Sequence, residues 1–220
     1  MKKGIPVQKK ENEKLLRILM EQTSIIMSNM SESRKSFYAS YKIGDKMEFI
    51  NGNVVTQSPN LKHSIPLKNL LNIISAYIQK TKIGLVKVDV LVSLTENDFM
   101  PDISYFGNEK ANQILLETIH YPAPDFVVEV LASTSDIIDK EIKLNDYEKH
   151  GVKEYWIVSP EDHDVFHYLL NESGKYQMVE RFSEEVKSEV LRLSIPLDAI
   201  FDGAINLTFI HELTADDMDI

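Results

Sequence analysis

Acidic side chains stand at unusual places in one stretch of the sequence, residues 101–156. Glu129 lies inside the apolar run FVVEV, Asp125 opens the same run, and Asp102 opens an earlier strand-like segment. Positions 125 and 129 point to the same side of a strand, because side chains alternate with a period of two. A buried carboxylate is costly unless it is paired, hydrogen-bonded or bound to a metal ion. The sequence therefore predicts a partner for Glu129.

Lysines in the next segment are the candidate partners. Lys140 and Lys143 lie on a predicted helix, where Tyr147 and His150 follow Lys143 on the same face. Two acids near strand ends, together with a lysine, suit Mg²⁺, which takes few carboxylates and completes its shell with water and phosphate oxygens. A buried ion pair with a purely structural role explains the same residues. Residue type and spacing leave both interpretations open.

The composition excludes several other chemistries. The 220 residues contain no cysteine, which removes disulfide frameworks, thiolate metal sites, iron–sulfur clusters and thiol nucleophiles. The nucleotide-binding motifs G-x-G-x-x-G and G-x-x-x-x-G-K-[ST] do not occur, and neither do H-E-x-x-H and G-x-S-x-G. No apolar run approaches the length of a membrane span. We expect a soluble, cytoplasmic protein without a membrane partner.

The formal net charge of −10 is unevenly distributed. Residues 1–153 carry a net charge of +1, and residues 154–220 carry −11. Binding to a nucleic-acid duplex depends on lysine and arginine side chains that neutralise phosphates. The first two thirds of the chain could therefore approach a phosphate backbone, whereas the acidic last third would resist it.

The hydrophobic pattern predicts the elements that must position these residues. The pair Asn51-Gly52 predicts a tight hairpin between MEFI and VVTQ. Apolar residues at intervals of three and four predict a helix over residues 61–79. Alternating valines predict one half-buried strand over residues 85–94.

Strands and helices alternate in the following part of the chain. We expect a short strand at DISYF, a helix from about residue 109 to 118, and a central strand, buried on both faces, at DFVVEVL. A helix that Ser133 or Thr134 can cap, and that Gly151 ends, leads to the strand KEYWIVS, so these two strands should pair in parallel. The strand segments VFHYLL, KYQMVERF and EVLRLSI then predict an antiparallel extension. The fold class is α/β with a mixed sheet.

Several strings of this sequence resemble, in the same order, motifs of the Uma-two (Uma2) family of restriction-endonuclease-like proteins, part of the PD-(D/E)XK nuclease superfamily. They are PDISYF, APDFVVEVLASTS, KLNDY and GVKEYWIVSP. MEFINGNVV resembles the family's N-terminal hairpin, Ser58-Pro59 with His63 its entry into the first core helix, and LSIPLDAIF its usual close. The resemblance covers about residues 41–201. It implies a restriction-endonuclease-like core, a mixed β-sheet flanked by helices, with an N-terminal helix and a C-terminal antiparallel meander.

The family's functional residues can be carried over by matching position. The resemblance implies that Asp102 and Glu129 bind Mg²⁺ or Mn²⁺, and that Lys143 contacts the scissile phosphate or the attacking water. Lys140 remains a rival for the role of Lys143. Further matched positions near the same site are Glu48, His63, Asp125 and Tyr147.

Three positions depart from the family's pattern. Leu131 stands where the simplest form of the superfamily motif has its lysine, so the lysine must come from the helix. Ala132 replaces a usual serine, and Ser159 replaces an acid that is common before the last proline. These changes alter the surroundings of the implied site but none of its implied metal-binding acids.

We expect three parts in the chain. Residues 1–40 form a basic tail and a helix whose apolar residues lie within positions 11–28, residues 41–205 form the restriction-endonuclease-like domain, and residues 206–220 form an acidic tail. The resemblance implies a metal-dependent endonuclease that hydrolyses phosphodiester bonds of nucleic acid, with DNA as the first expected substrate. One alternative is a non-catalytic nucleic-acid-binding or regulatory module. The other is a homo-oligomeric interaction domain, a homodimer paired through the N-terminal helix. Covering an open edge of the sheet is an equally good role for this helix.

Overall fold

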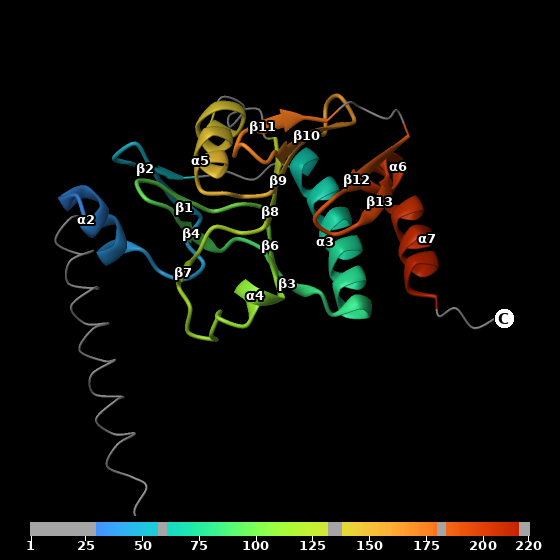
Figure 1. Ribbon diagram of the computed structural model, residues 1–220, viewed down its shortest axis with the longest axis horizontal. Coiled ribbons are helices and arrows are strands. Elements are labelled where there is room, and N and C mark those ends of the chain that lie inside the picture. The colour runs from blue at the N-terminus through green and yellow to red at the C-terminus, as the bar shows by residue number, and fades with distance from the viewer. Residues whose placement is uncertain (1–29, 57–60, 132–137, 180–183, 216–220) are drawn as a thin grey trace, which may run out of the picture.

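A mixed six-stranded sheet forms the centre of the protein (Figure 1). The computed structural model describes residues 30–56, 61–131, 138–179 and 184–215. Within them, the sheet has the order β11-β10-β9-β8-β6-β3, in which β8 and β9 run parallel and the other pairs antiparallel. The predicted α/β class with a mixed sheet is confirmed. The strands are β3 (Gly84–Lys87), β6 (Ile103–Gly107), β8 (Phe126–Val130), β9 (Glu154–Ser159), β10 (Asp164–Leu170) and β11 (Tyr176–Met178).

Two smaller sheets accompany the central one. A five-stranded sheet has the order β2-β1-β5-β4-β7, and β12 and β13 form an antiparallel pair of their own. The strands of the first are β1 (Met47–Ile50), β2 (Asn53–Thr56), β4 (Leu91–Ser93), β5 (Asp98–Phe99) and β7 (His120–Tyr121). The pair consists of β12 (Glu185–Ser188) and β13 (Leu193–Pro196).

Helices cover the central sheet on both faces. Figure 1 shows α3, α6 and α7 on one side, and α5 with the five-stranded sheet and α2 on the other. The α-helices are α2 (Glu32–Ser40), α3 (Leu61–Thr81), α4 (Asn108–Ala111), α5 (Leu144–Lys149), α6 (Leu197–Phe201) and α7 (Gly203–Thr214), and a π-helix, η1 (Ile138–Lys143), leads directly into α5.

The side chains on the two faces of the central strands belong to two separate hydrophobic cores. Val128 and Trp156 belong to the cluster under α3, whereas their neighbours Val127 and Tyr155 belong to the cluster that contains Tyr147 of α5. This alternation follows from the period of two in a strand. Each large apolar side chain buried in this way contributes about 1.5–3 kcal/mol. A polar side chain in the middle of such a strand therefore stands out.

Three predicted elements are confirmed with their physical reasons. Asn51 and Gly52 have φ values of 50° and 83°, as the two-residue hairpin between β1 and β2 requires. Helix α3 covers the predicted range and ends two residues later, at Thr81. Strand β8 is buried throughout and pairs in parallel with β9.

The single strand expected over residues 85–94 is wrong. The segment forms β3 in the central sheet and β4 in the five-stranded sheet, and the chain turns between them at Asp89, with a φ of 50°. Alternating valines suit either sheet equally, so the pattern could not show the break. The first residue of β3 is Gly84. A side chain does not fit at this position, because a Cβ would collide with the carbonyl oxygen of Phe106 on β6.

Two other predicted elements need correction. The helix expected over residues 109–118 is limited to the single turn α4; Ile114 still packs partly against the core, whereas Leu115 and Leu116 are 67% and 100% exposed. The segment EVLRLSI is not one strand, since it turns at Arg192 with a φ of 56° before β13 begins. Strands β10 and β11 do extend the central sheet, but β12 and β13 pair separately.

The ends of the chain differ in how much is described. The expected N-terminal helix over residues 11–28 and the caps Ser133 and Thr134 lie outside the described residues. Helix α2 was not expected from the sequence. Helix α7 crosses the expected boundary at residue 205, and its apolar residues Phe209, Ile210 and Leu213 pack against the core under α3.

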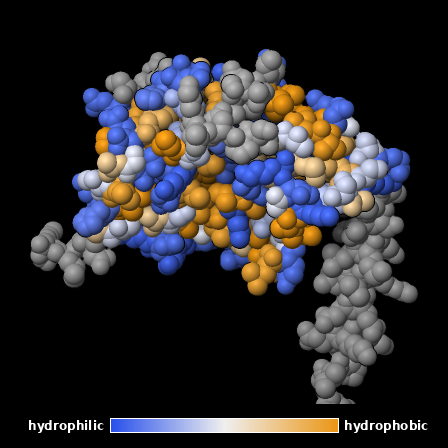
Figure 2. Space-filling model, turned by 180° about the vertical axis from the view of Figure 1, so that it is seen from behind, coloured by the Kyte–Doolittle hydropathy of each residue, from blue (hydrophilic) through white to orange (hydrophobic). Residues whose placement is uncertain are grey.

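Both polar and apolar residues are exposed on the surface of the protein. Seen from behind, apolar residues form several groups separated by polar ones (Figure 2). Among the helices of the described ranges, none combines the length and apolar character that crossing a bilayer would require.

Candidate active site

Glu129 is the polar side chain in the middle of the buried central strand β8. It is 3% exposed. Its Oε1 atom lies 2.9 Å from Nζ of Lys143 and accepts a hydrogen bond of 3.2 Å from the Tyr147 hydroxyl. Both partners come from the η1–α5 segment that connects β8 to β9. The partner that the sequence predicts for Glu129 is therefore present, and it is Lys143.

Lys143 holds three carboxylates together. Its Nζ atom lies 2.9 Å from Glu129, 3.0 Å from Oε1 of Glu48 and 3.1 Å from Oδ1 of Asp139, and the side chain is 0% exposed. Asp139 was missed by the sequence reasoning, although its position four residues before Lys143 on one helical segment was a usable signal. We refer to Glu48, Glu129, Asp139, Lys143 and Tyr147 as the Lys143 cluster.

Glu48 reaches the cluster from the N-terminal hairpin. It lies on β1, is 1% exposed, and accepts a 2.7 Å hydrogen bond from the backbone N–H of Met100. Glu48 is therefore buried although it lies on a hairpin near the N-terminal end of the described chain. The cluster thus combines side chains from a hairpin, a central strand and a connecting helix.

Burial and charge act in opposite directions on the two central groups. Burial raises the pKa of Glu129, and the nearby acids Asp139, Asp102 and Glu48 add to this against the opposing effect of Lys143. Burial would lower the pKa of Lys143, but Glu129, Glu48 and Asp139 outweigh it and raise that pKa well above its ordinary value. The three carboxylates therefore favour the ammonium form of Lys143. If all three carboxylates are ionised, the cluster carries two negative charges in excess.

Asp102 lies beside Glu129 but has partners of its own. Continuing the pairing of Ile103 with Val128 by one residue places Asp102 opposite Glu129. The Oδ2 atom of Asp102 accepts a 2.7 Å hydrogen bond from the N–H of Val130 and lies 3.0 Å from Nε2 of His63. This hydrogen bond raises the pKa of His63. Asp102 and His63 thus form a pair next to the Lys143 cluster.

Two sequence candidates lie elsewhere. Asp125 stands at the start of β8, where it accepts a hydrogen bond from the N–H of Gly107 and pairs with Lys110 and Lys153. Lys140 places its ammonium group 5.2 Å from the centre of the Phe166 ring. The structure therefore brings Lys143, and not Lys140, to Glu129.

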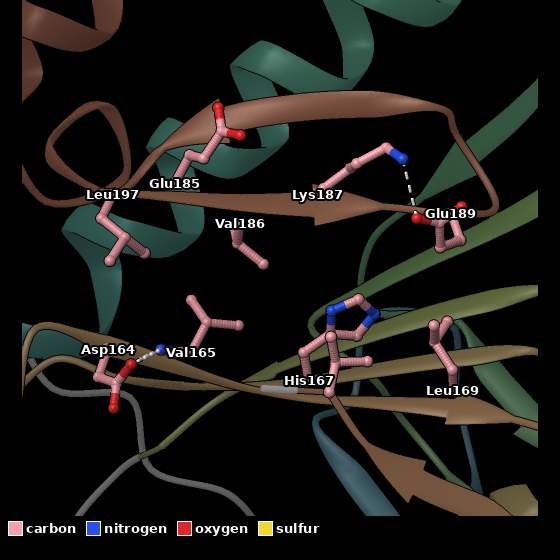
Figure 3. A pocket seen from close by; sticks show the side chains of 10 residues that line it. Asp164, Val165, His167, Leu169, Glu185, Val186, Lys187, Glu189 and Leu197 are labelled. Atoms are coloured by element: carbon pink, nitrogen blue, oxygen red, sulfur yellow. Dashed lines mark hydrogen bonds and ion pairs between the residues drawn. The ribbon is translucent and has the colours of Figure 1, made fainter. Parts of the chain in front are cut away.

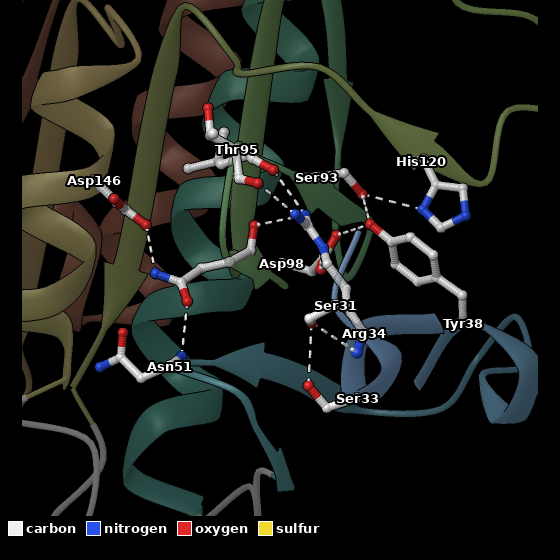
Figure 4. A network of polar contacts seen from close by, with 12 residues as sticks. Ser31, Ser33, Arg34, Tyr38, Asn51, Ser93, Thr95, Asp98, His120 and Asp146 are labelled. Atoms are coloured by element: carbon white, nitrogen blue, oxygen red, sulfur yellow. Dashed lines mark hydrogen bonds and ion pairs between the residues drawn. The ribbon is translucent and has the colours of Figure 1, made fainter. Parts of the chain in front are cut away.

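A polar network fixes the elements around the cluster (Figure 4). The amide of Asn97 donates to Asp146 of α5 at 2.6 Å and accepts from the N–H of Asn51 in the β1–β2 turn at 2.8 Å. Arg34 of α2 donates to Asp98 at 2.7 Å. It also donates to two backbone carbonyls of the β4–β5 turn, the turn that contains Asn97. These bonds tie the elements that carry Glu48 and Lys143 to one another. Nothing in the sequence pattern indicated them.

The donor chemistry of the region suits a hard divalent cation. Among the residues described, no three acidic or histidine side chains converge so that they could hold a metal ion by themselves. Magnesium, however, is commonly held by one or two carboxylates plus waters and substrate phosphates. The neighbouring carboxylates of Asp102 and Glu129 are compatible with such a site.

Residues 35–199 match the model of the Uma2 family, described as "Putative restriction endonuclease". The chain belongs to the Uma2 family. The match includes every member of the Lys143 cluster as well as Asp102 and His63. No curated protein matches this Uma2 chain.

Solved structures show the same fold. Five solved chains match this Uma2 protein. One of them is the crystal structure of a putative nuclease belonging to DUF820 from Anabaena variabilis, with a TM-score of 0.62 and 19% sequence identity. The match covers 75% of the present chain and 94% of the Anabaena chain. The restriction-endonuclease-like fold expected from the sequence is confirmed.

Proposed function

We propose that this Uma2 protein is a metal-dependent endonuclease that hydrolyses phosphodiester bonds of nucleic acid, with DNA as the first substrate to test. The observation that carries the proposal is the buried ammonium of Lys143 among three carboxylates, beside the Asp102–His63 pair. Strongly perturbed pKa values of buried charged groups cluster at functional sites. The printed descriptions, "Putative restriction endonuclease" for the family and "putative nuclease" for the Anabaena protein, agree with this chemistry.

Each residue has a role in this proposal. Asp102 and Glu129 would hold Mg²⁺ or Mn²⁺, which when bound lowers the pKa of water and neutralises charge on the phosphate. Lys143 would place its positive charge toward a phosphate oxygen as negative charge develops there. Glu48 and Asp139 fix the position of the Lys143 ammonium, and His63 fixes the Asp102 carboxylate.

A cleavage assay tests the proposal. Plasmid, linear duplex, single-stranded DNA and RNA are incubated with purified protein and Mg²⁺, Mn²⁺ or EDTA, beside Glu129→Gln and Lys143→Met. We expect cleavage that requires the metal and falls about 100-fold or more in both variants. Lys140→Met is the matched control, because it removes a lysine from the same π-helix without touching Glu129. Equal cleavage by wild-type protein and Lys143→Met would refute the assignment.

The burial of the cluster favours a second candidate function. Lys143 is 0% exposed and already contacts three carboxylates, an arrangement that would also serve a nuclease fold that binds nucleic acid without cleaving it. Nucleic-acid binding that persists in EDTA, with no cleavage of any substrate by folded protein, would support this alternative.

A homodimer belongs to the same set of proposals. The predicted apolar face within residues 11–28 would pair two copies. Light scattering of the full chain and of a chain lacking residues 1–29 measures the mass of each in solution. A mass of one copy for the full chain would contradict the dimer.

A further inference from the structure

A cavity of about 370 Å³ lies between β10 and the β12–β13 hairpin. Its volume is in the range of small-molecule sites. Val165 and Val186 point toward one another across the gap between the two strands (Figure 3). The other apolar lining residues are Leu169, Val179 and Leu197. The cavity is thus an apolar space at the edge of the core, large enough for a ligand of about ten non-hydrogen atoms.

Of the polar residues that line the cavity, only His167 is buried, and its side chain makes no hydrogen bond to the described residues. His167 is 6% exposed, and its Nε2 atom lies 2.9 Å from Oε1 of Glu154, out of line for a hydrogen bond. Its Nδ1 atom has no hydrogen-bond partner among the described residues. Buried polar groups are nearly always hydrogen-bonded, so a buried imidazole beside a cavity points to a bonding group that enters from the cavity.

The neighbouring carboxylate decides what His167 can bind. Glu154 is 0% exposed and accepts hydrogen bonds from the Trp156 indole, the Ser188 hydroxyl and the N–H of Val190. An imidazole nitrogen 2.9 Å from a carboxylate oxygen carries a proton, so in the neutral ring Nε2 is the protonated nitrogen and Nδ1 is an acceptor. The cavity thus offers a buried acceptor to a ligand N–H, whereas its one cationic donor, the ammonium of Lys187, lies at the exposed rim.

The rim of the cavity is acidic. Asp164, Glu185 and Glu189 lie on it, against the single cation Lys187, which pairs with Glu189 at 3.0 Å. The rim therefore carries two negative charges in excess. An apolar floor, a buried acceptor and an acidic rim together complement a cation on an apolar body.

We propose that this cavity binds a small organic cation, an ammonium or amidinium group attached to an apolar body. The N–H of the cation donates to Nδ1 of His167, and its apolar part lies between Val165 and Val186. This site is separate from the Lys143 cluster. Val165 and Trp156, which contacts the His167 ring, belong to the core under α3, whereas Tyr147 of the cluster belongs to the core on the other face of the sheet. The inference therefore stands independently of the nuclease proposal.

Benzylamine, which is cationic at neutral pH, is the probe, with benzyl alcohol and benzoate as its neutral and anionic counterparts. Each is titrated into the full-length protein while the methyl resonances of Val165 and Val186 are followed by NMR. We expect saturable shifts with benzylamine, binding about two- to fivefold weaker for the alcohol, and no saturable binding of benzoate. Benzoate that binds as tightly as benzylamine, or unperturbed valine methyls at all concentrations, would overturn the proposal.

Variants locate the interaction. Glu185→Lys reverses a charge at the exposed rim and should weaken benzylamine about two- to fivefold, whereas Glu172→Lys makes the same change in the exposed β10–β11 turn and should leave the affinity unchanged. His167→Phe removes the acceptor and should weaken benzylamine about two- to tenfold. If His167→Phe does not fold, the comparison of the two exposed lysine variants still decides. Equal weakening by both would overturn the proposed site.

Discussion

The ammonium of Lys143 lies 2.9 Å from the carboxylate of Glu129 in a region that water does not reach. Replacing Lys143 with Met would leave Glu48, Glu129 and Asp139 without their shared cation. Breaking a buried ion pair by removing one partner typically costs about 3–5 kcal/mol. We expect a loss of this size in the free energy of unfolding, measured by urea denaturation.

Lys140 provides the matched control for this measurement. Its ammonium lies 5.2 Å from the centre of the Phe166 ring, and an interaction of this kind is worth about 0.5–2 kcal/mol. Lys140→Met should therefore cost far less than Lys143→Met. Equal losses in the two variants would mean that the three carboxylates do not depend on Lys143.

Divalent metal should stabilise the folded chain if Asp102 and Glu129 hold it. A ligand that binds only the folded state raises stability by mass action, by about 2.7 kcal/mol at 100 times its dissociation constant. We expect Mn²⁺ to raise the melting temperature of the wild-type protein and EDTA to reverse the rise. Asp102→Asn and Glu129→Gln should lose the effect, and Asp125→Asn should keep it. A rise of the same size in all three variants would place the metal elsewhere.

Asp125 should make the free energy of unfolding depend on pH in the acidic range. Burial alone would raise the pKa of Asp125, but the N–H of Gly107 and the charges of Lys110 and Lys153 outweigh it and hold the pKa below its ordinary value of 3.8. A depressed carboxyl pKa contributes stability that is present above the ordinary value and is lost as the pH falls through the folded-state pKa.

The variant Asp125→Asn tests this dependence by urea denaturation across pH. The wild-type protein should exceed it in free energy of unfolding by about 1–3 kcal/mol at pH values of about 5 to 7. The difference should shrink as the pH falls below about 3.8. A difference that does not change with pH would show that the charge of Asp125 does not contribute.

Arg34 should anchor helix α2. Its guanidinium group donates to Asp98, which is 0% exposed, and to the carbonyl oxygens of Thr95 and Leu94. Arg34→Met should cost about 3–5 kcal/mol, because Asp98 would lose its charged partner. Lys35→Met, one residue later, removes only an exposed pair with Glu32 and should cost at most about 0.5 kcal/mol. Hydrogen exchange of α2 should rise in the first variant alone.

Local patterns were sufficient for much of the fold. The Asn51-Gly52 hairpin, helix α3 and strand β8 follow from turn chemistry and hydrophobic periodicity. The break at Asp89 could not be predicted, because the valines on either side alternate in the same way and differ only in which sheet they join. Helix α4 ends early, at Ala111, and Leu115 and Leu116 are exposed, neither of which periodicity alone indicates.

Sequence patterns likewise predicted one part of the candidate site and not the other. The cost of burying Glu129 predicted a cationic partner, and the spacing along one helix offered Lys140 or Lys143. Only the three-dimensional arrangement chooses Lys143, because Lys140 faces Phe166. Glu48 reaches the cluster through a hairpin that is distant in sequence, and Asn97 joins that hairpin to α5, so neither contact has a local signature.

Glu48, Glu129 and Lys143 belong to segments that the ribosome releases at different times. Lys143 meets Glu48 only after the hairpin, β8 and the connecting helix have come together, and β8 is not enclosed until β9 has been made. A nascent chain or a fragment that ends before β9 therefore contains the acids without the arrangement that unites them. If the cluster is a nuclease centre, cleavage requires a chain that has been synthesised beyond β9 and has folded. Removal of misfolded chains then also limits cleavage.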